Sequence, residues 1–92
     1  MKITYDPAAN SIYVRISQFQ EVGTGETIVD DAGVIIDTDA NGNPRGYEFL
    51  AVREKGVPLA DLPSPVARAL DDFTSSGALN SETPVERDYE AQ

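Results

Sequence analysis

Two short β-rich runs on either side of Asn41-Gly42 constrain the fold of this chain more than any other feature. An Asn-Gly pair between alternating apolar residues is the strongest short-range signal of a β-hairpin, because both residues tolerate the positive φ of a two-residue turn. With this pair at the centre of the turn, the predicted register pairs Val34 with Phe49. Further along, it pairs Thr38 with Arg45. The register collects branched and aromatic residues on one face, which supports the hairpin independently of the turn.

The same residues also fit the pattern of an EF-hand calcium loop, D-x-[DN]-x-[DN]-G-x5-E. The candidate ligands in that pattern are Asp37, Asp39, Asn41 and Glu48. An EF-hand folds its last glutamate back onto the ion, whereas Glu48 of an extended hairpin lies roughly 20 Å from the tip, at about 3.3 Å per residue. The flanking runs are also poor helix formers. We therefore interpret the segment as a turn, and a weak calcium site remains the alternative.

The chain before this hairpin also alternates with the period of a strand. Residues 2–5 and 11–17 are two such runs, separated by the turn-forming residues 6–10, and they predict a first hairpin. Residues 20–30 predict a weaker strand, because Gly23 and Gly25 interrupt it. We therefore expect a small antiparallel sheet of four to five strands.

A single helix is predicted after the sheet, over residues 64–77. Ser64-Pro65 supplies an N-cap followed by a proline at the first helical position, and Gly77 supplies a stop. Between them, the buried stripe of a helix is predicted by the spacing of Val66, Ala69, Leu70 and Phe73. The predicted fold is thus α+β, with one domain over residues 1–77 and a flexible acidic tail over residues 78–92.

Composition excludes several functions. The chain has 92 residues, no cysteine and no histidine, so it lacks thiol nucleophiles and the usual general base. Its serines have no histidine to activate them, and we expect neither catalysis nor a cofactor. A net charge of −9 opposes direct binding to nucleic acid or to anionic membranes. Without an apolar leader or a membrane-length run, a cytoplasmic location is expected.

Candidate partner-binding residues come from two places. On the reverse face of the sheet we expect Tyr13, Arg15 and Leu50, together with Ile35 and Val52. A partly apolar reverse face in so short a chain predicts a covering partner, and a homodimer is expected. In the acidic tail, two large apolar residues are candidate anchors for a basic protein partner, Val85 and Tyr89.

The opening segment, Lys2-Ile3-Thr4-Tyr5-Asp6 through Tyr13-Val14-Arg15-Ile16, resembles the signature of the domain-of-unknown-function family numbered 2283. That signature begins K-I-x-Y-D and continues Y-[IV]-[RK]-[LI]. Its second half is similar to residues 33–50, with departures at Pro44-Arg45 and at Tyr47. The resemblance covers roughly residues 1–55. It implies a compact antiparallel sheet and carries over no catalytic residue.

Members of that family are often encoded beside small basic toxin-like proteins, so the resemblance points to an antitoxin-like role. Together with the negative charge, it leads us to expect a non-enzymatic, acidic protein-binding module that neutralises a basic partner. A phage-type inhibitor that mimics the charge of DNA is one alternative. A weak calcium-binding domain is another.

Overall fold

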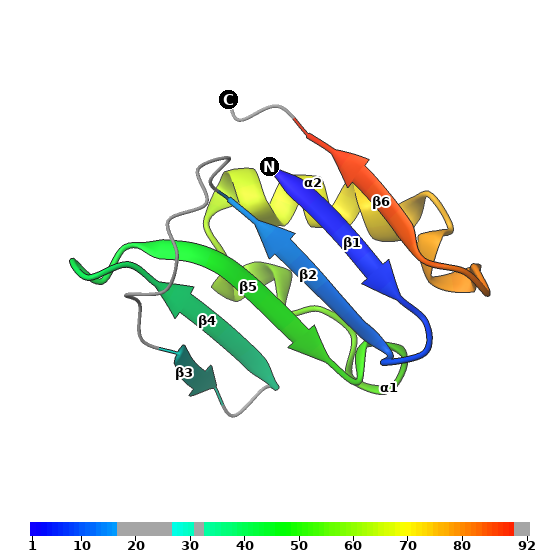
Figure 1. Ribbon diagram of the computed structural model, residues 1–92. Coiled ribbons are helices and arrows are strands. Elements are labelled where there is room, and N and C mark those ends of the chain that lie inside the picture. The colour runs from blue at the N-terminus through cyan, green and yellow to red at the C-terminus, as the bar shows by residue number, and fades with distance from the viewer. Residues whose placement is uncertain (17–26, 31–32, 90–92) are drawn as a thin grey trace.

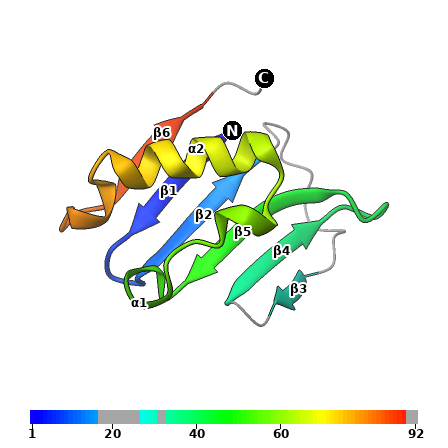
Figure 2. The same ribbon diagram turned by 180° about the vertical axis from the view of Figure 1, so that it is seen from behind.

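The fold is α+β, with one antiparallel sheet covered on one side by helices (Figures 1 and 2). We describe it from a computed structural model, for residues 1–16, 27–30 and 33–89. The strands run in the order β3-β4-β5-β2-β1-β6. Their bounds are β1 Lys2–Asp6, β2 Ser11–Arg15, β3 Thr27–Asp30, β4 Val34–Thr38, β5 Pro44–Leu50 and β6 Val85–Asp88. The α-helices are α1 Val52–Lys55 and α2 Ser64–Ser75, and two 3-10 turns are η1 Leu59–Asp61 and η2 Ala78–Asn80.

The hairpin of β4 and β5 confirms most of the predicted register, including the pairing of Val34 with Phe49. The prediction is wrong at the tip, where Thr38 pairs with Pro44 instead of Arg45. The connection is a three-residue loop closed by a backbone hydrogen bond of 2.8 Å from the Asp39 N–H to the Asn43 carbonyl. Gly42 takes a φ of 84° in this loop. A three-residue loop with its last residue in the left-handed region shifts the register by one residue on one strand.

The predicted first hairpin is confirmed. β1 pairs antiparallel with β2, from Lys2 opposite Arg15 to Asp6 opposite Ser11. β3 pairs with β4 at the edge of the sheet and coincides with the end of the weaker predicted strand. The remainder of that prediction, including Gly23 and Gly25, lies outside the described residues.

The predicted helix forms over α2, and its four predicted core residues are all buried. Ser64 makes no side-chain capping bond, because the helix begins at Ser64 itself, with Pro63 as the preceding cap residue. Gly77, at a φ of 86°, follows the end of the helix as predicted. Figure 2 shows α2 lying across β1 and β2 on the helical side. There Leu70 and Phe73 are completely buried and belong to the core that the sheet supplies.

Val52 was expected on the reverse face of the sheet, and that prediction is wrong. Ala51 takes left-handed backbone angles, with φ 53° and ψ 45°, at the point where β5 ends. This residue turns the chain out of the strand, so the alternation of faces stops there. Val52 therefore begins α1 on the helical side and is 2% exposed.

The prediction of a flexible tail over residues 78–92 is also wrong for most of that segment. After α2 the chain forms η2 and then β6, which pairs antiparallel with the outer edge of β1. The register places Val85 beside Tyr5, and Val85 packs against the core. Three of the four residues in β6 are charged, a composition that protects an edge strand from pairing with other chains. The charged composition that suggested a tail therefore belongs to an edge strand of the sheet.

Candidate functional site: the open face of the sheet

No helix of the described residues lies on the side of the sheet that faces the viewer in Figure 1. Because residues alternate between faces along a strand, this side carries the neighbours of the core residues. We call it the open face, and its members are Lys2, Thr4, Asp6, Ser11, Tyr13, Arg15, Ile35, Asp37, Gly46, Glu48, Leu50, Glu86 and Asp88. The largest exposed apolar side chains of the described residues both lie here, Tyr13 at 36% and Leu50 at 39% exposure.

Tyr13 is held in place across three strands. From β2 its hydroxyl reaches over β5 and donates a hydrogen bond of 3.2 Å to Asp37 Oδ2 on β4. The ring can take this path because Gly46 lies beneath it, and a Cβ at that position would overlap the phenol oxygen. Burial against the sheet raises the pKa of Tyr13, and the negative charge of Asp37 raises it further. Tyr13 is thus a partly exposed, preoriented aromatic surface.

Charged groups surround this apolar centre, and most of them are acidic. The carboxylates are Asp6, Asp37, Glu48, Glu86 and Asp88, and the cations are Lys2 and Arg15. Lys2 forms an ion pair of 3.4 Å with Glu86 across the β1–β6 pair. The charges of Arg15 and Glu48 act on the pKa of Tyr13 in opposite directions, since Arg15 lowers it and Glu48 raises it. The open face therefore combines an exposed aromatic and a leucine with a surplus of negative charge.

The four calcium candidates do not converge on one point. The Asp39 carboxylate is used by the turn itself, since its Oδ1 accepts the N–H groups of Asn41 and Asn43 at 2.9 Å each. These hydrogen bonds, with the nearby Arg45, lower the pKa of Asp39. Glu48 pairs with Ile35, far down the hairpin. Within the described ranges no group of three metal-ligating acidic, histidine or cysteine side chains is assembled.

The two tail residues proposed as partner anchors have internal contacts. The Tyr89 hydroxyl donates a hydrogen bond of 2.9 Å to Asp72 Oδ2 on α2, and its backbone N–H donates one of 2.6 Å to the Met1 carbonyl. Burial and the Asp72 contact raise the pKa of Tyr89. Val85 and Tyr89 both pack against the core. They therefore hold β6 on the body of the protein, on the side opposite the open face.

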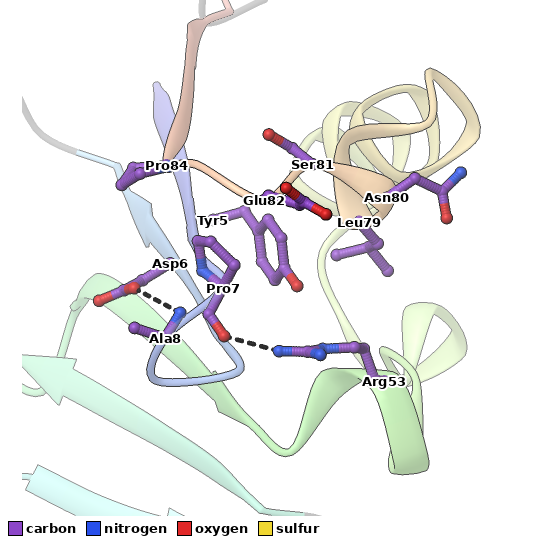
Figure 3. A pocket seen from close by; sticks show the side chains of 10 residues that line it. All are labelled: Tyr5, Asp6, Pro7, Ala8, Arg53, Leu79, Asn80, Ser81, Glu82 and Pro84. Atoms are coloured by element: carbon purple, nitrogen blue, oxygen red, sulfur yellow. Dashed lines mark hydrogen bonds between the residues drawn. The ribbon is translucent and has the colours of Figure 1, made fainter.

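A second feature, which sequence reasoning missed, is a pocket of about 460 Å³ at the end of the sheet where β1 meets the segment before β6. Figure 3 shows its walls, formed by the β1–β2 turn, Arg53 of α1 and residues 79–84. The pocket exists only because β6 docks beside β1, and the sequence analysis treated that segment as a tail. The pairing of Tyr5 with Val85 joins residues far apart in the sequence, and no local sequence pattern indicates it.

In the described part of the chain, none of the helices has the length and apolarity needed to cross a membrane.

Comparison with known proteins agrees with the sequence signature. No curated protein and no solved structure matches the chain. Residues 2–53, which span β1 to the start of α1, match the family described as "Protein of unknown function (DUF2283)". Because that match covers more than half of the 92 residues, the chain belongs to this family.

Proposed function

We propose that this protein is a non-enzymatic binding module whose open face binds a basic protein partner. The observation that carries the proposal is the exposed pair of Tyr13 and Leu50 within an acidic surround. Aromatic side chains dominate the binding energy of many interfaces, especially where they are already oriented before binding. The hydrogen bond to Asp37 and the seat over Gly46 give Tyr13 that orientation.

Charge favours a basic partner over a second copy of the chain. Among the described residues the open face carries five carboxylates and two cations, and the whole chain carries a net charge of −9. Two such faces repel each other, whereas a basic protein is attracted before contact and associates faster. An antitoxin-like module that neutralises a basic toxin-like protein is the most specific form of this function.

The experiment first captures proteins from the source organism's lysate on the immobilised chain and on a Leu50→Ser variant. Each protein that the parent captures and the variant loses is identified, purified and tested for direct binding. We expect a protein of basic isoelectric point, bound at least about tenfold more weakly by Leu50→Ser and by Tyr13→Ala, as for a central interface residue. Capture that is equal for parent and variants contradicts the proposal.

A pair of charge reversals tests the role of the acidic surround. Glu48→Lys on the open face and Asp71→Lys on the exposed side of α2 change the net charge equally. We expect Glu48→Lys to slow association more, and added salt to reduce the difference, because salt screens electrostatic steering. Light scattering of the chain alone tests whether a second copy of the chain binds the open face instead. A dimer of the parent that Leu50→Ser dissociates would assign the open face to a second copy instead.

A further inference from the structure

The pocket at the end of the sheet is lined by Tyr5, whose hydroxyl makes no hydrogen bond within the described residues. Tyr5 is 1% exposed, yet its side chain lines the pocket. In Figure 3 its ring stands at the centre of the view, with the hydroxyl directed between Leu79 and Arg53. The hydroxyl makes no hydrogen bond within the described ranges of the chain, and no polar side-chain atom there is fully enclosed without a partner. The hydroxyl is therefore open to the pocket, where it is available to hydrogen-bond a bound molecule.

A positive charge lies on the wall of the same pocket and is held rigidly. The Arg53 guanidinium donates from Nε to Asn10 Oδ1 at 3.1 Å and from Nη2 to the Pro7 carbonyl at 2.6 Å. Both acceptors are neutral, and Arg53 forms no ion pair with any described residue. Its remaining N–H groups, on a planar fork suited to carboxylates, are not taken up by those two bonds.

Negative charge is present at the opposite wall. Glu82 is exposed and has no hydrogen bond or ion pair within the described residues. Asp6 accepts the N–H groups of Ala8 at 3.0 Å and Ala9 at 3.4 Å through Oδ1, and Figure 3 shows its carboxylate directed away from Tyr5 and Glu82. Between the charged groups, Leu79 adds an apolar wall. The pocket thus combines one cation, one carboxylate, a hydroxyl and an apolar surface.

We propose that this pocket binds a small zwitterion with an apolar side chain, of the class of the free apolar α-amino acids. The ligand's carboxylate would accept hydrogen bonds from Arg53 and from the Tyr5 hydroxyl. Its ammonium group would contact Glu82, and its side chain would contact Leu79. A volume of about 460 Å³ lies within the range of about 300–1,000 Å³ that is usual for small-molecule sites. Neither Tyr13 nor Leu50 lines the pocket, so this inference does not depend on the proposed function.

The probes are L-leucine and two analogues that each lack one charge. L-Leucinamide lacks the carboxylate, and 4-methylpentanoate lacks the ammonium group. Binding to the full chain is followed by titration with amide-resolved NMR, up to millimolar ligand. We expect saturable shifts for L-leucine that are centred on residues 5–8 and 79–84, and at least about tenfold weaker binding for each analogue, because each loses a charge-assisted hydrogen bond.

Two variants connect the binding to this pocket. Tyr5→Phe removes only the unpaired hydroxyl, and Glu82→Gln removes only a charge, so both should keep the fold. Each should weaken L-leucine binding by about tenfold or more. Matched controls on the open face, Tyr13→Phe and Glu48→Gln, should leave it unchanged. Absence of saturable binding, equal binding of either analogue, or equal binding by Tyr5→Phe and Glu82→Gln would each overturn the proposal.

Discussion

Replacing Gly46 with alanine tests the packing of Tyr13 over the sheet. The new methyl group would occupy the position of the phenol oxygen and would also lie 3.1 Å from the Val14 carbonyl. The oxygen is the far end of a side chain that is 36% exposed, so we expect the ring to swing outward while the backbone stays in place. The movement breaks the hydrogen bond to Asp37.

The size of the effect follows from two opposing terms. Alanine in a strand is favoured over glycine by about 0.5–1 kcal/mol, because glycine loses more conformational freedom on folding. The lost Tyr13–Asp37 hydrogen bond costs about 0.5–1.5 kcal/mol. The displaced ring also loses contact with the sheet. The net free energy of unfolding should therefore fall by at most about 1.5 kcal/mol in the parent chain.

The sign should reverse when the tyrosine is absent. In a Tyr13→Ala background there is no ring to displace, so Gly46→Ala should raise the free energy of unfolding by about 0.5–1 kcal/mol. The four proteins of this double-mutant cycle are compared by urea unfolding, and the coupling between the two sites should be about 1–2 kcal/mol. If Gly46→Ala destabilises both backgrounds equally, the cost arises at the Val14 carbonyl and the packing argument for Tyr13 is wrong.

Four further predictions concern the rest of the molecule. Phe73→Ala should lower the free energy of unfolding by about 3–5 kcal/mol, because the ring is completely buried, whereas the exposed Ser75→Ala should change it little in the same urea titration. Deleting residues 81–92 should lower the melting temperature, because it uncovers the edge of β1, and an unchanged melt would mean that β6 is not docked. The folded-state pKa of Asp39 is depressed, so its contribution to stability is present above the unfolded value of about 3.8 and is lost as pH falls through the folded pKa; a carboxyl NMR titration with its midpoint at or above 3.8 would contradict this. Millimolar calcium should leave the melting temperature unchanged, whereas occupancy at 100 times a dissociation constant would add about 2.7 kcal/mol.

The parts of the fold that follow from local pattern could be predicted. The alternation of apolar residues around the Asn-Gly turn predicted the pairing of Val34 with Phe49. The helical spacing of apolar residues predicted the buried stripe that includes Leu70 and Phe73. Both signals come from residues close together in the sequence, where one face must be apolar and the other polar. The same reasoning placed Tyr13 and Leu50 together on one exposed face.

The remaining parts depend on single backbone angles or on distant contacts. The left-handed conformation of Ala51 could not be predicted from the sequence, because alanine rarely adopts it. This conformation places Val52 on the helical side of the sheet instead of the open face. A charged edge strand has the composition of a disordered tail, so β6 was mistaken for one. The pocket required both β6 and the β1–β2 turn, and it could not be anticipated once β6 was missed.

The pairing of β1 with β6 has a consequence for the order in which the protein is made. β1 is synthesised well before its outer neighbour, Val85–Asp88, because most of the sheet and α2 lie between them in the sequence. At about 5–20 residues per second, the edge of β1 has no partner strand for several seconds of synthesis. During that time its N–H and C=O groups remain a template for pairing with other chains. A nascent chain stalled before residue 85 should therefore aggregate, or recruit chaperones, more readily than the finished protein.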